Sequence, residues 1–222
     1  MAMVGNVILF DVGGPIDLEF AWEMAMDSAI AAACGLEGIR VDEGMIEAAS
    51  ARAVASFASD AYADIIETLC GGDPATIARV RRRIDGITAN LDVFQLRPEI
   101  DGLLRRLGER GLKLGIVANR PDAVARQLGR AGIAPFFDYA GALEMAAQVL
   151  GMAPADCIVV GDRIDKDIAP ARALGMATIL FRSGRYRRQQ PRTPAEAPDA
   201  IVTDVPELEA AIVSLLGRQA MR

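Results

Sequence analysis

Short apolar runs alternate with amphipathic stretches over most of this chain of 222 residues. The runs are rich in Val, Ile and Leu and are bounded by residues typical of turns, which predicts buried parallel strands. The expected strands are residues 6–11, 112–118, 157–161, 177–181 and 200–202. Because strand and helix alternate, we expect an α/β fold, a Rossmann-like parallel sheet with right-handed crossovers.

The helical patterns between these runs each end at or just before a glycine, which is a common helix terminator. The expected helices are residues 99–109, 121–131, 142–150, 166–174 and 206–216, closed by Gly111, Gly132, Gly151, Gly175 and Gly217.

Two segments depart from the alternation. Residues 17–92 are rich in Ala, Met and Glu and have helical spacing without a convincing strand. We therefore predict an all-helical subdomain at 17–92, inserted into a core formed by residues 1–16 and 93–222. Residues 182–199 carry five arginines and three prolines, and we interpret them as a solvated loop or as a rim that attracts an anionic substrate.

The composition narrows the class of partner. With 24 basic and 30 acidic residues the net charge is −6, so we expect no general attraction to nucleic acid or to an anionic membrane. The chain starts without a signal-like leader, and no apolar run approaches the ~20 residues that span a bilayer. The three scattered cysteines, Cys34, Cys70 and Cys157, are expected to be reduced and buried. We therefore expect a soluble, cytoplasmic protein, with the oligomeric state open.

Histidine is absent, which excludes nucleophile schemes that use a Ser-His or Cys-His pair. Polar residues end three of the expected strands: Asp11, Asn119 and, after Gly161, Asp162. Ligands bind at the carboxyl ends of parallel strands, and two neighbouring carboxylates repel each other unless a cation lies between them. Oxygen ligands suit Mg²⁺, so the sequence predicts a magnesium site at this edge.

Three motifs carry a family resemblance: "VILFDVGGPID", "LGIVANRPD" and "IVVGDRIDKDIAPARALGMATILF", the last with Asp162 and Asp167 in a GD-then-D pattern. With these motifs the chain resembles the haloacid dehalogenase superfamily over nearly its whole length. Most members are phosphatases with a Rossmann-like core and a cap inserted after the first strand. The placement of the helical insert is similar to that of the phosphoglycolate-phosphatase-like branch.

The resemblance implies that Asp11 is a nucleophile that becomes an aspartyl-phosphate. It also implies that Asp11, the backbone carbonyl of Gly13 and Asp162 hold Mg²⁺, with Asp167 in support. The implied substrate is a small phosphorylated molecule. The implied phosphate contacts are Gly13, Gly14 and Asn119.

Three positions differ from the family pattern. The family's phosphatases carry a second aspartate, the acid-base group, where this chain has Gly13, and a Ser or Thr where it has Ala118. The segment "FFDYAGALEMAAQVLG" contains no lysine where the family places one. Lys113 begins its strand, too far from the site to substitute. The basic residues expected on the correct edge, either replacing this lysine or facing solvent, are Arg120, Arg163 and Lys166.

Three functions remain open at this point. The first is a Mg²⁺-dependent phosphatase with an incomplete site, the second is a non-catalytic ligand-binding or regulatory protein on the same fold, and the third is a metal-independent dehalogenase. The substrate is left open. Several residues also have purely structural interpretations: Asp11 as a turn cap, Asn119 as a helix N-cap before Pro121, Asp165 as a helix-start carboxylate, and Trp22, Met24 and Met26 as helix packing or an apolar lid.

Overall fold

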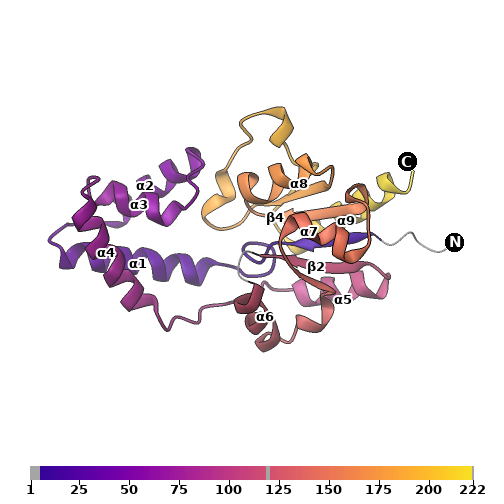
Figure 1. Ribbon diagram of the computed structural model, residues 1–222, viewed down its shortest axis with the longest axis horizontal. Coiled ribbons are helices and arrows are strands. Elements are labelled where there is room, and N and C mark those ends of the chain that lie inside the picture. The colour runs from indigo at the N-terminus through magenta and orange to yellow at the C-terminus, as the bar shows by residue number, and fades with distance from the viewer. Residues whose placement is uncertain (1–5, 119–120, 222) are drawn as a thin grey trace. The chain divides into compact units, whose positions relative to one another are not determined.

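The computed structural model describes residues 6–118 and 121–221. It forms two compact units (Figure 1). The first comprises the described parts of Met1–Leu18 and Gln95–Arg222, and the second is Glu19–Phe94.

The first unit is built on a sheet of six parallel strands in its described residues, in the order β3-β2-β1-β4-β5-β6. The strands are β1 (Val7–Phe10), β2 (Lys113–Val117), β3 (Tyr139–Gly141), β4 (Cys157–Gly161), β5 (Ala177–Phe181) and β6 (Ala200–Val202). The predicted α/β class is therefore confirmed. The chain moves from β1 to β2 and β3 on one side and then returns to β4 on the other, so strand order reverses between β1 and β4. Ligands bind at such a reversal in open α/β sheets.

The edge strand β3 was missed by the sequence interpretation. It has only three residues, Tyr139–Gly141, and none of them is fully buried. The apolar-run pattern identifies strands that are covered on both faces, and β3 lacks that pattern because its three residues are exposed or only partly buried.

The helices of this unit are α5 (Ile100–Glu109), α6 (Pro121–Arg130), α7 (Leu143–Leu150), α8 (Ala169–Ala173) and α9 (Val205–Gln219). Positive φ angles at the glycines that follow the first helices agree with their predicted role as terminators: Gly111, Gly132, Gly151 and Gly175.

Two helix predictions were wrong in detail. Gly217 does not end a helix, because it lies inside α9. Packing of the apolar face of α9 outweighs the cost of one glycine, about 1 kcal/mol relative to alanine. The helix expected at 166–174 starts earlier, as the π-helical turn η3 (Ile164–Ile168), which continues into α8.

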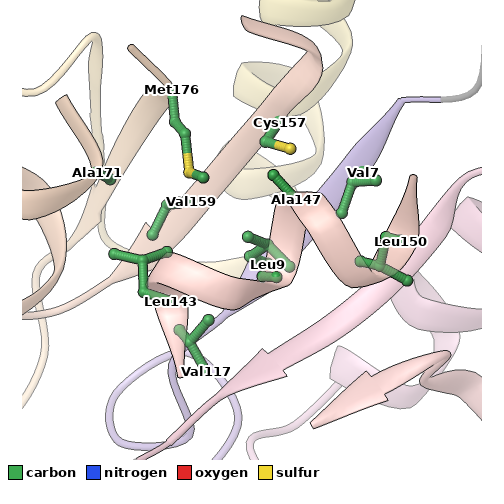
Figure 2. Close-up of a cluster of buried hydrophobic side chains, with 11 residues drawn as sticks. Val7, Leu9, Val117, Leu143, Ala147, Leu150, Cys157, Val159, Ala171 and Met176 are labelled. Carbon is green, nitrogen blue, oxygen red and sulfur yellow. The ribbon is translucent and has the colours of Figure 1, made fainter. Parts of the chain in front are cut away.

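A cluster of buried side chains holds β1 and β4 side by side (Figure 2). Val7 and Leu9 of β1 and Cys157 and Val159 of β4 lie on the same face of the sheet, where helix α7 covers them. Because side chains alternate between the faces of a strand, the neighbouring residues of β1 fill the opposite face, and all four residues of β1 are fully buried. The two strands pair in parallel with Phe10 opposite Val160, so they end at the same edge of the sheet.

The second unit contains α1 (Phe20–Leu36), α2 (Glu43–Ala55), α3 (Ala61–Leu69) and α4 (Pro74–Thr88), and none of its described residues forms a strand. Three of these helices start at an aspartate whose carboxylate accepts a hydrogen bond from the backbone three residues on, which stabilises the helix start. These caps are Asp42, Asp60 and Asp73.

The side chains expected to pack in this unit differ in exposure: Met26 is buried, Trp22 is half-buried and Met24 is exposed. Packing therefore accounts for Met26 and not for Met24. The three cysteines are free and buried. Within the part of the chain that the structure describes, no helix is both long and apolar enough to cross a bilayer.

Candidate metal centre

Three aspartates converge at the carboxyl ends of β1 and β4. Asp11 follows β1, Asp162 follows β4, and Asp167 lies in η3. The backbone N–H of Asp11 donates to the carbonyl oxygen of Val160 at 2.8 Å, which continues the ladder between the two strands. One carboxylate oxygen of each aspartate lies within 4.8 Å of the others. The structure thus brings together the three carboxylates singled out in the sequence, at the reversal of strand order.

Burial makes this cluster electrostatically costly. Asp162 and Asp167 are buried, and Asp11 is half-buried. Loss of solvation raises the pKa of Asp167 to about 6, although the backbone N–H of Arg163 donates to its Oδ2 at 2.9 Å and opposes the shift. A divalent cation offsets the repulsion of such carboxylates. Three carboxylates without nitrogen or sulfur donors form a ligand set that suits a hard ion such as Mg²⁺, so the residues present fit that ion.

Two glycines make room for the carboxylates. Gly14 has a φ of 78°, and a Cβ placed on it would lie 2.7 Å from the Cβ of Asp162. A Cβ on Gly161 would overlap the side chain of Asp167. Contacts this close do not occur between real side chains, so glycine is required at both positions by space, and at Gly14 also by backbone conformation.

The turn after Asp11 is closed by its own backbone. The N–H groups of Ile16 and Asp17 both donate to the carbonyl oxygen of Val12, at 3.1 and 2.8 Å. Gly13 lies inside this turn and forms an isolated bridge with Asp17. Its implied contacts with metal and phosphate stay predictions.

The candidate basic groups differ in their surroundings. Arg163 donates through its guanidinium to both carboxylate oxygens of Asp165, at 2.7 and 3.2 Å, and its Nη1 donates to the hydroxyl of Tyr186 at 3.0 Å. Lys166 is exposed. Lys113 lies at the amino end of β2 and donates to the carbonyl oxygen of Leu150 at 2.8 Å, at the far end of the sheet as expected.

The remaining predicted positions belong to β2 and η3. The backbone N–H of Ala118 donates to the carbonyl oxygen of Gly141 at 3.0 Å. The predicted phosphate ligand Asn119 and the candidate cation Arg120 lie outside the described residues. Asp165 is not one of the three clustered aspartates, because its carboxylate is bound to Arg163.

Two contacts at this edge were not anticipated from the sequence. Arg97 donates from Nε to the carbonyl oxygen of Gly14, and Gln189 accepts a hydrogen bond from the backbone of Ile164. Both side chains come from segments without periodic structure, far along the chain from their partners. The pattern of residues therefore carried no signal for either contact.

Comparison with known proteins agrees with this geometry. The model of the HAD-hydrolase-like family matches residues 139–208, which include β4, η3 and β5. A glyceraldehyde 3-phosphate phosphatase of Methanopyrus kandleri is 36% identical over 116 residues, covering 46% of this chain and 50% of that protein. A phosphoserine phosphatase of Thermus thermophilus is 28% identical over 152 residues, covering 62% of this chain and 58% of that protein. The chain thus spans about half the length of the curated relatives it matches.

The similarity in structure extends further along the chain. A solved structure of a predicted phosphoglycolate phosphatase from Haemophilus somnus superposes with a TM-score of 0.68 and 17% identity, covering 95% of this chain and 97% of the other. At this identity the match shows a shared fold. With the family match, it confirms the resemblance to the haloacid dehalogenase superfamily.

Proposed function

From this confirmed resemblance, we propose that the protein is a Mg²⁺-dependent phosphatase acting on a small phosphate ester, with Asp11 as the nucleophile and residues 19–94 as its cap. The observation that carries the proposal is the convergence of Asp11, Asp162 and Asp167 within 4.8 Å at the reversal of strand order. That the curated relatives are phosphatases of small phosphate esters supports the substrate class.

The proposed reaction starts with in-line attack of the Asp11 carboxylate on phosphorus. The ester P–O bond breaks as the Asp11–phosphorus bond forms, and the leaving oxygen takes the electron pair and departs as an anion that gains its proton from solvent. Water then attacks the phosphorus of the aspartyl-phosphate, which releases inorganic phosphate and regenerates the Asp11 carboxylate. Asp11, Asp162, Asp167 and the carbonyl of Gly13 would hold Mg²⁺, whose charge stabilises the negative charge on the phosphoryl oxygens.

The site lacks a side chain at position 13 that could protonate the leaving group. Gly13 cannot deliver this proton, and the loss of a positioned acid typically costs ~10²–10⁴-fold in rate. An ester whose leaving group is already stable as an anion does not need that proton. We therefore expect aryl phosphates to be hydrolysed much faster than alkyl phosphates.

The decisive experiment measures hydrolysis of an aryl phosphate by the wild type, Asp11→Asn and Asp101→Asn, each with Mg²⁺ and with EDTA. Asp101 is an exposed residue of α5, so Asp101→Asn controls for the loss of one carboxylate from the same unit. Turnover that is lost in Asp11→Asn and in EDTA, and kept in Asp101→Asn, supports the proposal. Turnover in Asp11→Asn equal to that of the wild type would rule out Asp11 as the nucleophile. Glyceraldehyde 3-phosphate and phosphoserine, taken from the relatives' names, start the substrate panel.

A non-catalytic ligand-binding or regulatory protein is the second candidate. It is favoured by Gly13 at the acid-base position and by the pairing of Arg163 with Asp165. This candidate predicts a Mg²⁺-dependent rise in melting temperature that Asp11→Asn abolishes, without turnover of any ester in the panel. A rate that depends on both Asp11 and Mg²⁺ would exclude it.

The cytoplasmic location stays a prediction.

A further inference from the structure

We propose that Gln189 is a positioning residue for the metal centre, and that it sets Mg²⁺ affinity by holding the segment that carries Asp167. The inference rests on the metal site proposed above. It assigns a role to the arginine-rich segment after β5, which the proposed reaction does not use.

Gln189 binds the metal-site loop with both ends of its side-chain amide. The side chain is buried, with 3% of the residue exposed. Its Oε1 accepts a hydrogen bond of 2.7 Å from the backbone N–H of Ile164, and its Nε2 donates to Oδ1 of Asp165 at 3.2 Å. The backbone N–H of Gln189 donates to the carbonyl oxygen of Tyr186 at 2.8 Å, which fixes the chain from which the side chain projects.

A second connection joins the same two segments. The guanidinium of Arg163 lies over the ring of Tyr186, 4.4 Å from its centroid, and donates to its hydroxyl at 3.0 Å. Arg163 also pairs with Asp165 at 2.7 Å, and only 16% and 13% of the two side chains are exposed. Tyr186 belongs to the short helix η4 (Arg185–Arg188). Tyr186 and Gln189 therefore both bind the segment 163–165, through hydrogen bonds and the ring contact with Arg163.

The backbone of Arg163 connects these contacts to Asp167. The N–H of Arg163 donates to Oδ2 of Asp167, and its carbonyl oxygen accepts from the N–H groups of Asp167 and Ile168, at 3.0 and 3.2 Å. The bond from Ile168 spans five residues and begins the π-helical turn η3. Turns of this kind are rare and are frequently found at functional sites. The first N–H groups of any helix lack partners within it, and Gln189 supplies the partner for the N–H of Ile164.

Loss of the Gln189 amide should therefore loosen the start of η3 and with it the carboxylate of Asp167. Outer partners of metal ligands typically contribute 10–100-fold to metal affinity. Gln189 reaches Asp167 only through the backbone of Arg163, so we expect Gln189→Ala to weaken Mg²⁺ binding by about 10-fold, at the lower end of this range. Tyr186→Phe removes one hydroxyl and keeps the stacked ring, so its effect should be smaller and in the same direction.

The test is a Mg²⁺ titration by calorimetry at 25 °C of the full chain, as wild type, Gln189→Ala, Tyr186→Phe and Gln190→Ala. Gln190 is the adjacent, exposed glutamine, with a single 3.4 Å hydrogen bond to the carbonyl oxygen of Arg188, and is the matched control. A purely structural role for Gln189 would lower the melting temperature in EDTA and leave the Mg²⁺ Kd of the folded protein unchanged. The expected result is a higher Kd for Gln189→Ala and an unchanged Kd for Gln190→Ala.

If Gln189→Ala does not fold, a second pair of substitutions tests the same contact. Gln189→Glu keeps the acceptor for Ile164 and sets a carboxylate against Asp165, so it should raise the Kd. Adding Asp165→Asn restores a donor opposite the new acceptor at the same net charge, and should recover part of the affinity.

The outcomes separate the two levels of the proposal. Equal Kd values for the wild type, Gln189→Ala and Gln189→Glu would overturn the positioning role and leave the metal site intact. Absence of Mg²⁺ binding in the wild type would overturn the metal site and the positioning role with it.

Discussion

The Nε–H of Arg97 donates a hydrogen bond of 2.6 Å to the carbonyl oxygen of Gly14, joining the turn after Asp11 to a residue 83 positions further along the chain. The same guanidinium donates to the hydroxyl of Ser183 at 2.6 Å and lies over the ring of Phe181, 4.5 Å from its centroid. Arg97 thus links the turn after Asp11 to the residues that follow β5.

Arg97→Met should destabilise this turn. A hydrogen bond from a charged group typically contributes about 1.5–3 kcal/mol, so we expect the melting temperature to fall by roughly 3–12 °C for a chain of this size. Arg105→Met is the control, because Arg105 is exposed and pairs with Asp101 only at 3.9 Å. Thermal unfolding measures both variants, and an equal, small shift for the two would contradict a specific role of Arg97.

Gly14→Ala tests whether space at this turn matters for the metal centre. The new Cβ meets Asp162 at 2.7 Å, so we expect the aspartate to shift and Mg²⁺ affinity to fall about 10-fold or more. Gly111 has the same φ of 78°, and a Cβ there would have nothing within 4 Å. Gly111→Ala therefore isolates the cost of the left-handed backbone conformation, roughly 1–2 kcal/mol. A titration with Mg²⁺ should separate the two variants, and equal affinities would show that the contact with Asp162 is unimportant.

Asp167→Asn should stabilise the metal-free protein at neutral pH. Burial raises the pKa of Asp167 to about 6 in the folded protein, above the usual value of an aspartate. The folded state therefore favours the protonated carboxyl group. This stabilisation is complete below the pKa of the unfolded chain and is lost as the pH rises through about 6. In EDTA we expect Asp167→Asn to melt several degrees above the wild type at pH 7.5, and the difference to shrink towards pH 4.5.

Saturating Mg²⁺ should reverse the order of the melting temperatures of the wild type and Asp167→Asn, because only the wild type keeps all three carboxylates. Asp101→Asn should follow the wild type in both conditions. If Asp167→Asn melts below the wild type in EDTA at pH 7.5, the carboxylate is not a source of strain in the metal-free site.

Gly13→Asp should increase phosphatase activity. It places a carboxyl group where the family's phosphatases have their acid-base aspartate, and Gly13 is not one of the described glycines that require a positive φ. The gain should be up to ~10²-fold for alkyl phosphates and small for aryl phosphates, whose leaving groups need no proton. Steady-state kinetics on one ester of each kind measures the ratio, and an equal gain for both would argue against a role in leaving-group protonation.

The elements that hold the aspartates were predictable because their signals are local. Burial on both faces makes β1 and β4 continuous apolar runs, and in a parallel sheet that pattern also tells at which edge Asp11 and Asp162 lie. Their proximity then follows from the pairing of β1 with β4, which packing under α7 maintains. Local patterns failed at β3, whose residues are exposed or only partly buried, and at Gly217, where packing outweighs propensity.

The network around the aspartates arises from contacts between distant segments. Arg163 donates to the hydroxyl of Tyr186, 23 residues away, as well as to Asp165, and no periodicity relates Arg163 to Tyr186. The same is true of Gln189 and Ile164. Residue order along the chain thus accounts for the strands and for which carboxylates meet at their ends, because burial imposes a repeating pattern. The partners that orient those carboxylates are set by the tertiary structure, because a single contact between distant segments leaves no repeating pattern in the sequence.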